Sequence, residues 1–207
     1  MSDIDEPDDE DPEPPSPTHA AAVGQLATAT AEGLEDLTIA ARDSDATAAR
    51  RVLRRSPRRR AARADAELAV RRDLTRSDPA SGALRRAACE LQLISLLAQV
   101  GDLVDAFARQ LAAGRTPRPV LDALAHDLET LGGAGGRRLR CIAYLSGPSM
   151  DGDYLRAGAA LRESLHRLGG GSPVGGGPVG AGRSVATTCS CLIQAVLSAS
   201  SFATRVA

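Results

Sequence analysis

The chain has 207 residues, of which 43% are hydrophobic and only 2% aromatic, and all 25 of its Lys and Arg residues are arginine. This length permits one large or two small domains with a sizeable core. The abundance of Ala, Leu and Arg and the scarcity of aromatic residues favour helices over strands, so we expect an all-α protein. The formal net charge of −1 argues against a general affinity for nucleic acids or membrane surfaces.

Residues 1–16 combine acidic residues and prolines with almost nothing apolar. Such a segment cannot bury enough surface to offset the entropy of ordering, so we expect a disordered acidic tail. It is either a solubilising extension or an arm that binds a basic partner or competes with one. The acidic start differs from a signal peptide, and no uninterrupted apolar run reaches the roughly 18 residues of a membrane span. We therefore expect a cytoplasmic protein.

Two helices are expected after the tail. Ser16-Pro17 has the chemistry of a helix start, and an apolar stripe follows it, which predicts a helix over about 17–43. Asp43-Ser44-Asp45 interrupts the pattern and caps a second helix over about 46–76. Pro57 should kink or locally unwind this second helix, because proline lacks a backbone donor and crowds the preceding turn.

A cluster of arginines lies on the second expected helix, and we select Arg51, Arg54, Arg55 and Arg58 as candidate partner-binding residues. A solvated helix face, a protein or anionic-lipid partner, and nucleic acid are the three interpretations. No aromatic residue is interleaved and no DNA-binding motif is present, so we expect no specific nucleic acid. The complete cluster is Arg50, Arg51, Arg54, Arg55, Arg58, Arg59, Arg60 and Arg63.

The segment 83–113 is expected to be the central helix of the fold. An apolar seam with alternating spacings of four and three runs along it, at Leu93, Leu97, Val100, Val104, Phe107 and Leu111. Ser77-Asp78-Pro79 precedes it and Gly114 follows it, in the positions of cap residues. Ala98, Asp102 and Asp105 share a face away from the seam. We expect a solvated acidic face there, with too few oxygen ligands to hold a hard cation.

The second half repeats the order helix, helix, long helix. Thr116-Pro117 is expected to begin a helix, and the glycine run 132–136 predicts a break or hinge in it. Another helix is expected to run to about Leu168, and the last helix to begin at Ser184. Residues 169–182 predict a flexible glycine–proline loop, without the spacing of a phosphate-binding loop. We therefore expect two tandem antiparallel three-helix bundles, residues 17–114 and 115–207.

No set of residues predicts catalysis. His19, His126 and His166 are scattered, and His126-Asp127 is interpreted as a surface pair on a helix. The four cysteines lack the paired spacing of a metal site, and we interpret them as small core residues. The alternative is that Cys189-Ser190-Cys191 forms half of a metal or redox site. We expect a protein that is not an enzyme and has no cofactor.

The central helix resembles that of the PhoU family of bacterial phosphate-uptake regulators. The family pattern is D-L-R, ten residues, then D-L-E-R-x-G-D, and this chain has Ala83-Leu84-Arg85, ten residues, then Leu96-Leu97-Ala98-Gln99-Val100-Gly101-Asp102. Gly101 and Asp102 match the family, whereas Leu96, Ala98 and Gln99 replace its Asp, Glu and Arg. In the family the sixth helix repeats an E-x-x-x-D pair, and the corresponding positions here are Leu197 and Ser201.

The resemblance implies the same tandem three-helix bundles and a cytoplasmic negative regulator of the phosphate-starvation response. The implied partners are the ATPase of a phosphate ABC transporter and a membrane sensor histidine kinase, with contact to the membrane only through them, and homodimers are common in the family. The loss of the acidic pairs predicts that this chain, unlike typical members, holds no metal cluster, since only Asp102 and its neighbour Asp105 remain. The alternatives are a divergent helical scaffold without a phosphate role, and a nucleic-acid-associated protein that uses its arginine-rich helix.

Overall fold

The computed structural model describes residues 19–76, 83–143, 152–170 and 179–206, which form helices and contain no strand. The expected all-α class is confirmed. The α-helices are α1 (His19–Arg42), α2 (Ala46–Arg54), α3 (Ser56–Arg76), α4 (Ala83–Ala112), α5 (Arg118–Ala123), α6 (Ala125–Thr130), α7 (Gly136–Ala143), α8 (Gly152–Gly170) and α9 (Val179–Val206). A π-helical turn, η2 (Leu131–Gly135), lies between α6 and α7.

The helix ends in the first half follow the sequence signals. The Asp45 carboxylate caps α2 by accepting hydrogen bonds from the backbone N–H groups of Thr47 (2.7 Å) and Ala48 (3.0 Å). The second expected helix is interrupted beside Pro57, as predicted, and becomes α2 and α3. Gly114 has a φ of 63° just after α4, a conformation that favours glycine. The acidic tail and the expected caps at Ser16-Pro17 and Ser77-Asp78-Pro79 lie outside the described residues.

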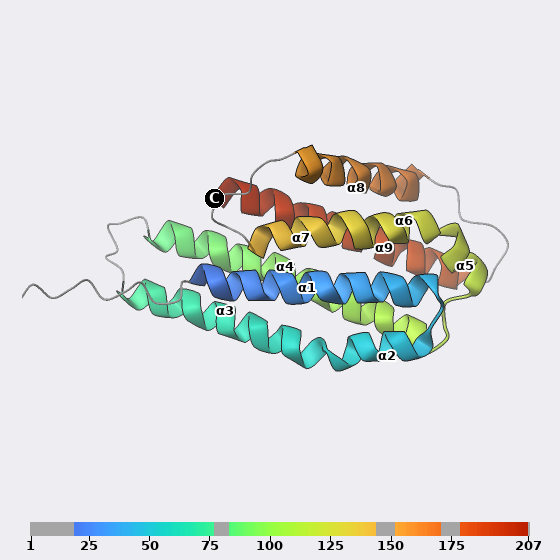
Figure 1. The fold of residues 1–207 in the computed structure, drawn as a ribbon, viewed down its shortest axis with the longest axis horizontal. Coiled ribbons are helices and arrows are strands. Elements are labelled where there is room, and N and C mark those ends of the chain that lie inside the picture. Colours follow the sequence, from blue (N-terminus) through green and yellow to red (C-terminus); the bar gives the residue numbers. More distant parts are fainter. Residues whose placement is uncertain (1–18, 77–82, 144–151, 171–178, 207) are drawn as a thin grey trace, which may run out of the picture.

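Helices α1 and α4 lie in the middle of the molecule, with α2 and α3 at one edge and α8 at the other (Figure 1). Helix α1 packs on α3, α4 and α7, and α4 packs on α1, α2, α3 and α9. All six residues of the predicted α4 seam are buried in one hydrophobic core, which both halves of the chain share. The apolar periodicity of α4 thus identified the side that the neighbouring helices cover.

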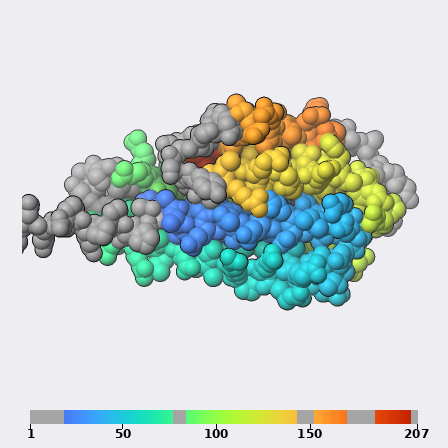
Figure 2. All heavy atoms as spheres, viewed as in Figure 1, coloured from blue at the N-terminus to red at the C-terminus, as the bar shows by residue number. Residues whose placement is uncertain are grey.

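The glycine run 132–136 breaks the regular α-helix with a π-helical turn, but it does not end the helical segment. The backbone remains helical through η2 into α7, and α1 packs directly against it. A Cβ atom at Gly132 would lie 2.3 Å from the Thr38 hydroxyl oxygen, and one at Gly136 would lie 2.3 Å from the Glu35 carboxylate. The glycines therefore allow a close helix–helix approach. In the space-filling view α1 lies between the surfaces of α3 and α7 (Figure 2).

Two expectations for the second half need correction. The Thr116 hydroxyl is buried without a hydrogen-bond partner among the described residues, and Pro117 occupies the N-cap position of α5 instead. The predicted loop 169–182 is shorter than expected, because α8 extends to Gly170 and α9 begins at Val179. Residues 171–178 lie outside the described part of the chain.

The two longest helices are strongly apolar. Two segments are long and apolar enough to cross a membrane, judged by length and mean hydropathy alone: Leu84–Ala112 of α4 and Val185–Ala203 of α9. In both segments polar residues interrupt the apolar sequence. In each helix 44% of the most apolar window is buried inside the protein. The two helices pack against each other, as expected for core helices.

Candidate functional site

A buried ion pair joins α3 to α4. The Arg59 guanidinium donates through Nη2 to Asp105 Oδ1, and the Ser56 hydroxyl donates to Asp105 Oδ2. The side chain of Arg59 is 6% exposed and that of Asp105 is 17% exposed. The sequence analysis placed Asp105 on a solvated acidic face. This expectation is wrong, because Asp105 is mostly buried in the ion pair. Removing one member of a buried pair typically costs about 3–5 kcal/mol, because the other charge stays buried without compensation.

Arg59 is buried because it occupies a position on the inward side of α2 and α3. The buried residues Val52, Ser56, Arg59, Ala66 and Val70 follow spacings of four, three, seven and four, so Arg59 projects inward while the neighbouring arginines project outward. Our sequence analysis treated the eight arginines as one cluster and missed this. The sequence of α3 has no clear apolar stripe, so it contained no signal that separates Arg59 from them.

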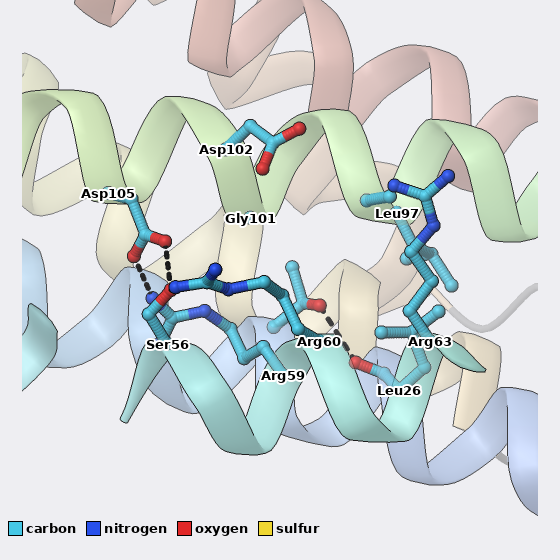
Figure 3. Close-up of a pocket in the computed structure, with 11 residues that line it drawn as sticks. Leu26, Ser56, Arg59, Arg60, Arg63, Leu97, Gly101, Asp102 and Asp105 are labelled. Atoms are coloured by element: carbon cyan, nitrogen blue, oxygen red, sulfur yellow. Dashed lines mark hydrogen bonds and ion pairs between the residues drawn. The ribbon is translucent and has the colours of Figure 1, made fainter. Parts of the chain in front are cut away.

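A small cavity of about 30 Å³ lies between α1, α3 and α4. Arg59, Arg60 and Arg63 line it from α3, opposite Gly101, Asp102 and Asp105 of α4 (Figure 3). Its apolar side is formed by Leu26 and Leu97, and the remaining lining residues are Thr30, Ser56 and Ala98. The Thr30 hydroxyl donates to the Leu26 carbonyl at 2.8 Å, so it is already engaged within α1. Guanidinium groups therefore dominate the polar lining.

Asp102 and Asp105 lie on the same face of α4, as predicted, but their environments differ. Asp102 is exposed, and no ion pair involves it within the described part of the chain. Ala98, at the position of the family's Glu, lines the cavity and is half-buried. Where the family pattern has a second acid, this chain therefore offers a methyl group opposite three arginines. Positive charge at this position opposes the binding of a cation.

The four candidate partner-binding arginines are all exposed. Arg55 forms an ion pair with Asp36 of α1, and Arg51 lies 3.8 Å from the Asp45 carboxylate. Arg54 and Arg58 form no ion pair with a described residue. Exposed ion pairs contribute little to stability, so all four side chains can exchange their present contacts for a partner. The prediction that they bind a partner remains a prediction.

Arg58 also lines an open groove of about 700 Å³ between α1 and α3. Most of its other lining residues are small, including Gly24, Ala29 and Ala62. Glu32 and Asp65 provide negative charge beside Arg58. The arginine-rich edge of α2 and α3 thus adjoins a surface into which another chain can fit.

A second buried arginine, Arg138, lies in α7. It donates from Nε to Ser200 Oγ (2.9 Å) and from Nη1 to the Tyr154 carbonyl (2.9 Å), and it lies 3.9 Å from the centroid of the Tyr154 ring. Burial lowers the pKa of Arg138 from its usual value. The positions that correspond to the family's second acidic pair are close by on α9, where Leu197 packs against the core and Ser201 is exposed.

His19, at the start of α1, bridges two carboxylates. Its Nδ1 lies 3.3 Å from Asp73 of α3, and its Nε2 lies 2.9 Å from Glu90 of α4. Burial is the main cause that raises the pKa of Glu90, and the charge of His19 partly opposes it. Sequence reasoning missed this cluster, because the three residues are far apart in the chain. The arrangement ties three helices together at one end of the molecule.

The remaining candidate residues are dispersed. His126 is exposed, whereas Asp127 is buried and accepts a hydrogen bond from Arg167 at 2.8 Å, so the expected surface pair is wrong. Cys189 is buried, which raises its pKa to about 12, while Cys191 is exposed. The interpretation of Cys191 as a core residue is therefore also wrong. Cys89 and Cys141 are half-buried, and all four cysteines are free thiols.

Among the described residues, no group of three or more His, Cys, Asp or Glu side chains is arranged to hold a metal ion. Comparison with known proteins adds no relative: no protein-family model, curated protein or solved structure matches this chain. The candidate site is therefore defined by its own geometry. It consists of the arginine-lined cavity between α3 and α4 and the exposed arginines beside it.

Proposed function

We propose that this protein is a PhoU-like, non-enzymatic regulator of phosphate uptake and phosphate-starvation signalling. It acts by binding the ATPase of a phosphate ABC transporter and a sensor histidine kinase. It works in the cytoplasm and reaches the membrane only through these partners; homodimers, which are common in the family, are an open alternative to a monomer. The proposal rests on the resemblance of α4 to the family helix, and on the exposed arginine surface of α2 and α3.

The helix order supports a tandem arrangement. We infer that α1 to α4 form one three-helix bundle, with α2 and α3 as a single interrupted helix, and that α5 to α9 form the second. Helix α1 packs on α7 and α4 packs on α9, so equivalent helices of the two proposed bundles contact each other. This pattern is the one expected of two similar units related by an approximate twofold axis.

The arginine surface is the observation that carries the binding role. The segment 46–76 contains eleven arginines and three acidic residues, although the whole chain is nearly neutral. Arg59 is buried, and the rest of this charge lies at the outer edge of the molecule, beside the open groove between α1 and α3 (Figure 1). Such a surface favours an acidic protein partner, because complementary charge accelerates and orients association.

Affinity capture with the full-length chain tests the proposal. We expect it to retain a transporter ATPase or a sensor kinase from extracts of the native organism, and to lose both when Arg51, Arg54, Arg55 and Arg58 are replaced by Gln. Replacement of Arg109, Arg115, Arg137 and Arg162, which are also exposed, changes the charge equally outside α2 and α3 and should preserve capture. Recovery of ribosomal or chromosomal material that persists at high salt would favour the nucleic-acid alternative. Capture of neither expected partner would favour a scaffold without a phosphate role.

The protein should also act without a metal cluster. A methyl group at Ala98 and the apolar side chain of Leu197 cannot act as ligands, and Asp105 is engaged by Arg59. Elemental analysis of protein purified without chelator checks this. Stoichiometric iron, zinc or manganese retained after gel filtration would contradict it and direct attention to Asp102, Asp105, Cys189 and Cys191.

A further inference from the structure

Two buried nitrogen atoms of Arg59, which carry three N–H donors, have no hydrogen-bond acceptor among the described residues. The Nη2 atom of Arg59 donates to Asp105, but Nε and Nη1 have no partner among the described residues, although the side chain is only 6% exposed. Nη1 lies against Gly33 of α1, where a Cβ atom would be 2.8 Å away, and Nε faces Gly101 of α4 at the cavity. Buried donors in folded proteins nearly always have a protein or solvent acceptor. Arg59 also lines the cavity, so these donors lie beside a space that an acceptor can occupy.

We propose that this cavity binds a small free oxyanion of the phosphate or sulfate type. Arg59 forms its floor, and the exposed side chains of Arg60 and Arg63 form its rim. Each planar guanidinium at the rim can present two N–H donors to two oxygens of such an anion, and Arg59 adds its positive charge. This inference uses only the geometry of α1, α3 and α4, and it does not depend on the proposed partners.

The existing contacts leave the rim arginines free to bind. Arg60 donates only a 3.2 Å hydrogen bond to Ser56 Oγ, and Arg63 uses Nε for an exposed ion pair with Glu67 at 2.8 Å. Arg63 extends from α3 toward α4, whereas Arg60 runs along α3 toward Ser56 (Figure 3). The apolar side formed by Leu26 and Leu97 lowers the local polarity, which strengthens charge–charge attraction in the cavity.

Charge and size define the class of ligand. Three guanidinium groups face two carboxylates, and one of these, Asp105, is already bound by Arg59 and Ser56. The remaining carboxylate, Asp102, lies on the opposite wall and repels an anion. A volume of about 30 Å³ holds roughly two water molecules, so the ligand is a small ion that projects partly through the open side and not an organic molecule.

Calorimetric titration of the full-length chain with inorganic phosphate, sulfate and chloride at constant ionic strength tests the site. Phosphate or sulfate should bind in a one-to-one ratio and more tightly than chloride. Replacement of both Arg60 and Arg63 by Gln should weaken binding by about tenfold or more, as expected for the loss of charge-assisted hydrogen bonds. Both residues are exposed, so this variant retains the fold, whereas a change at Arg59 removes a buried pair.

Two matched variants distinguish a built site from general attraction to arginine. Arg71→Gln with Arg72→Gln removes the same charge from α3 outside the cavity and should leave affinity unchanged. Asp102→Asn removes the opposing carboxylate and should tighten binding several-fold. The proposal is overturned if chloride binds as well as phosphate, if the two double variants lose affinity equally, or if Asp102→Asn has no effect. The proposal is also overturned if titrations at two different temperatures both give no heat of binding.

Discussion

The two halves of the molecule each bury an arginine, and they satisfy it differently. In the first half, Arg59 of α3 is paired with the carboxylate of Asp105 on α4. In the second half, Arg138 of α7 is held by the Ser200 hydroxyl, the Tyr154 carbonyl and the face of the Tyr154 ring. Tyr154 is itself fixed, because its hydroxyl donates to the Ser200 carbonyl at 2.9 Å.

Arg59 is held by a charged partner, whereas Arg138 is held by neutral groups. The carboxylate of Asp105 compensates the charge of Arg59, yet two Arg59 nitrogen atoms still lack acceptors among the described residues, which leaves the first half with donors for a ligand. Neutral dipoles and a π face stabilise Arg138, and no unsatisfied donor of Arg138 is found in the described structure. The buried arginine of the first half is therefore the better candidate for binding a ligand. The contacts of the buried arginine of the second half are already complete among the described residues.

The largest effect is expected from a charge in the shared core. Leu97→Asp or Val104→Asp in α4 places a carboxylate in the buried seam at a cost of several kcal/mol, which is comparable to the stability of a whole domain. Leu192→Asp in α9 is the equivalent change in the second half. Since α4 and α9 pack together, each variant should unfold the whole chain, so that thermal melts followed by circular dichroism show no cooperative transition. A half-sized transition that survives in either variant would show that the halves fold independently.

The next largest effect compares the two buried arginines directly. Asp105→Ala leaves Arg59 buried without a counter-charge and should cost about 3–5 kcal/mol. Ser200→Ala removes one neutral acceptor from Arg138 and should cost about 1–2 kcal/mol. Urea unfolding of both variants provides the measurement. Equal losses would mean that Asp105 is not the main stabilising partner of Arg59.

A smaller effect concerns the pH dependence of the first half. Burial raises the pKa of Glu90 above its ordinary value of 4.5, so the folded chain holds this proton more tightly than the unfolded chain. The resulting stabilisation is present below that value and is lost as the pH rises. The charges that act on Glu90 are those of His19, Asp73 and Arg86.

Glu90→Gln cannot lose this proton and keeps a polar side chain beside His19. Its stability relative to the wild type should therefore increase between pH 4 and pH 6 in urea titrations. A stability difference that stays constant or decreases over this range would contradict the assigned environment of Glu90. Ser200→Ala, in which the polar change is confined to the second half, should show a constant difference from the wild type across the same range.

The smallest effect is expected at Asp102. Its carboxylate is exposed and has no ion-pair partner within the described residues, so Asp102→Ala should change stability by no more than about 0.5 kcal/mol. Thermal unfolding followed by circular dichroism is sufficient to detect a larger change. If Asp102→Ala were as damaging as Leu97→Asp, the assignment of the faces of α4 would be wrong.

The sequence alone determined the helices and the inward side of the longest one. Composition excluded an aromatic-rich β protein, and the alternating spacing along α4 identified six residues that are all buried. Asp45, Pro57 and Gly114 act locally, through one or two backbone groups, so their effects on helix ends could be predicted. Helix α3 has no comparable apolar stripe, and Leu68 on it is exposed, so the burial of Arg59 could not be predicted in the same way.

Only the tertiary structure decided which polar residues meet. Asp105 is 46 positions from Arg59, and Glu90 is 71 positions from His19, so neither contact leaves a local pattern in the chain. The glycine-rich sequence 132–136 is typical of a hinge. Its role in the packing of α1 became visible only through the close approach of Thr38 and Glu35. Local periodicity specifies which side of a helix is covered, whereas the identity of the covering side chain depends on how distant segments pack.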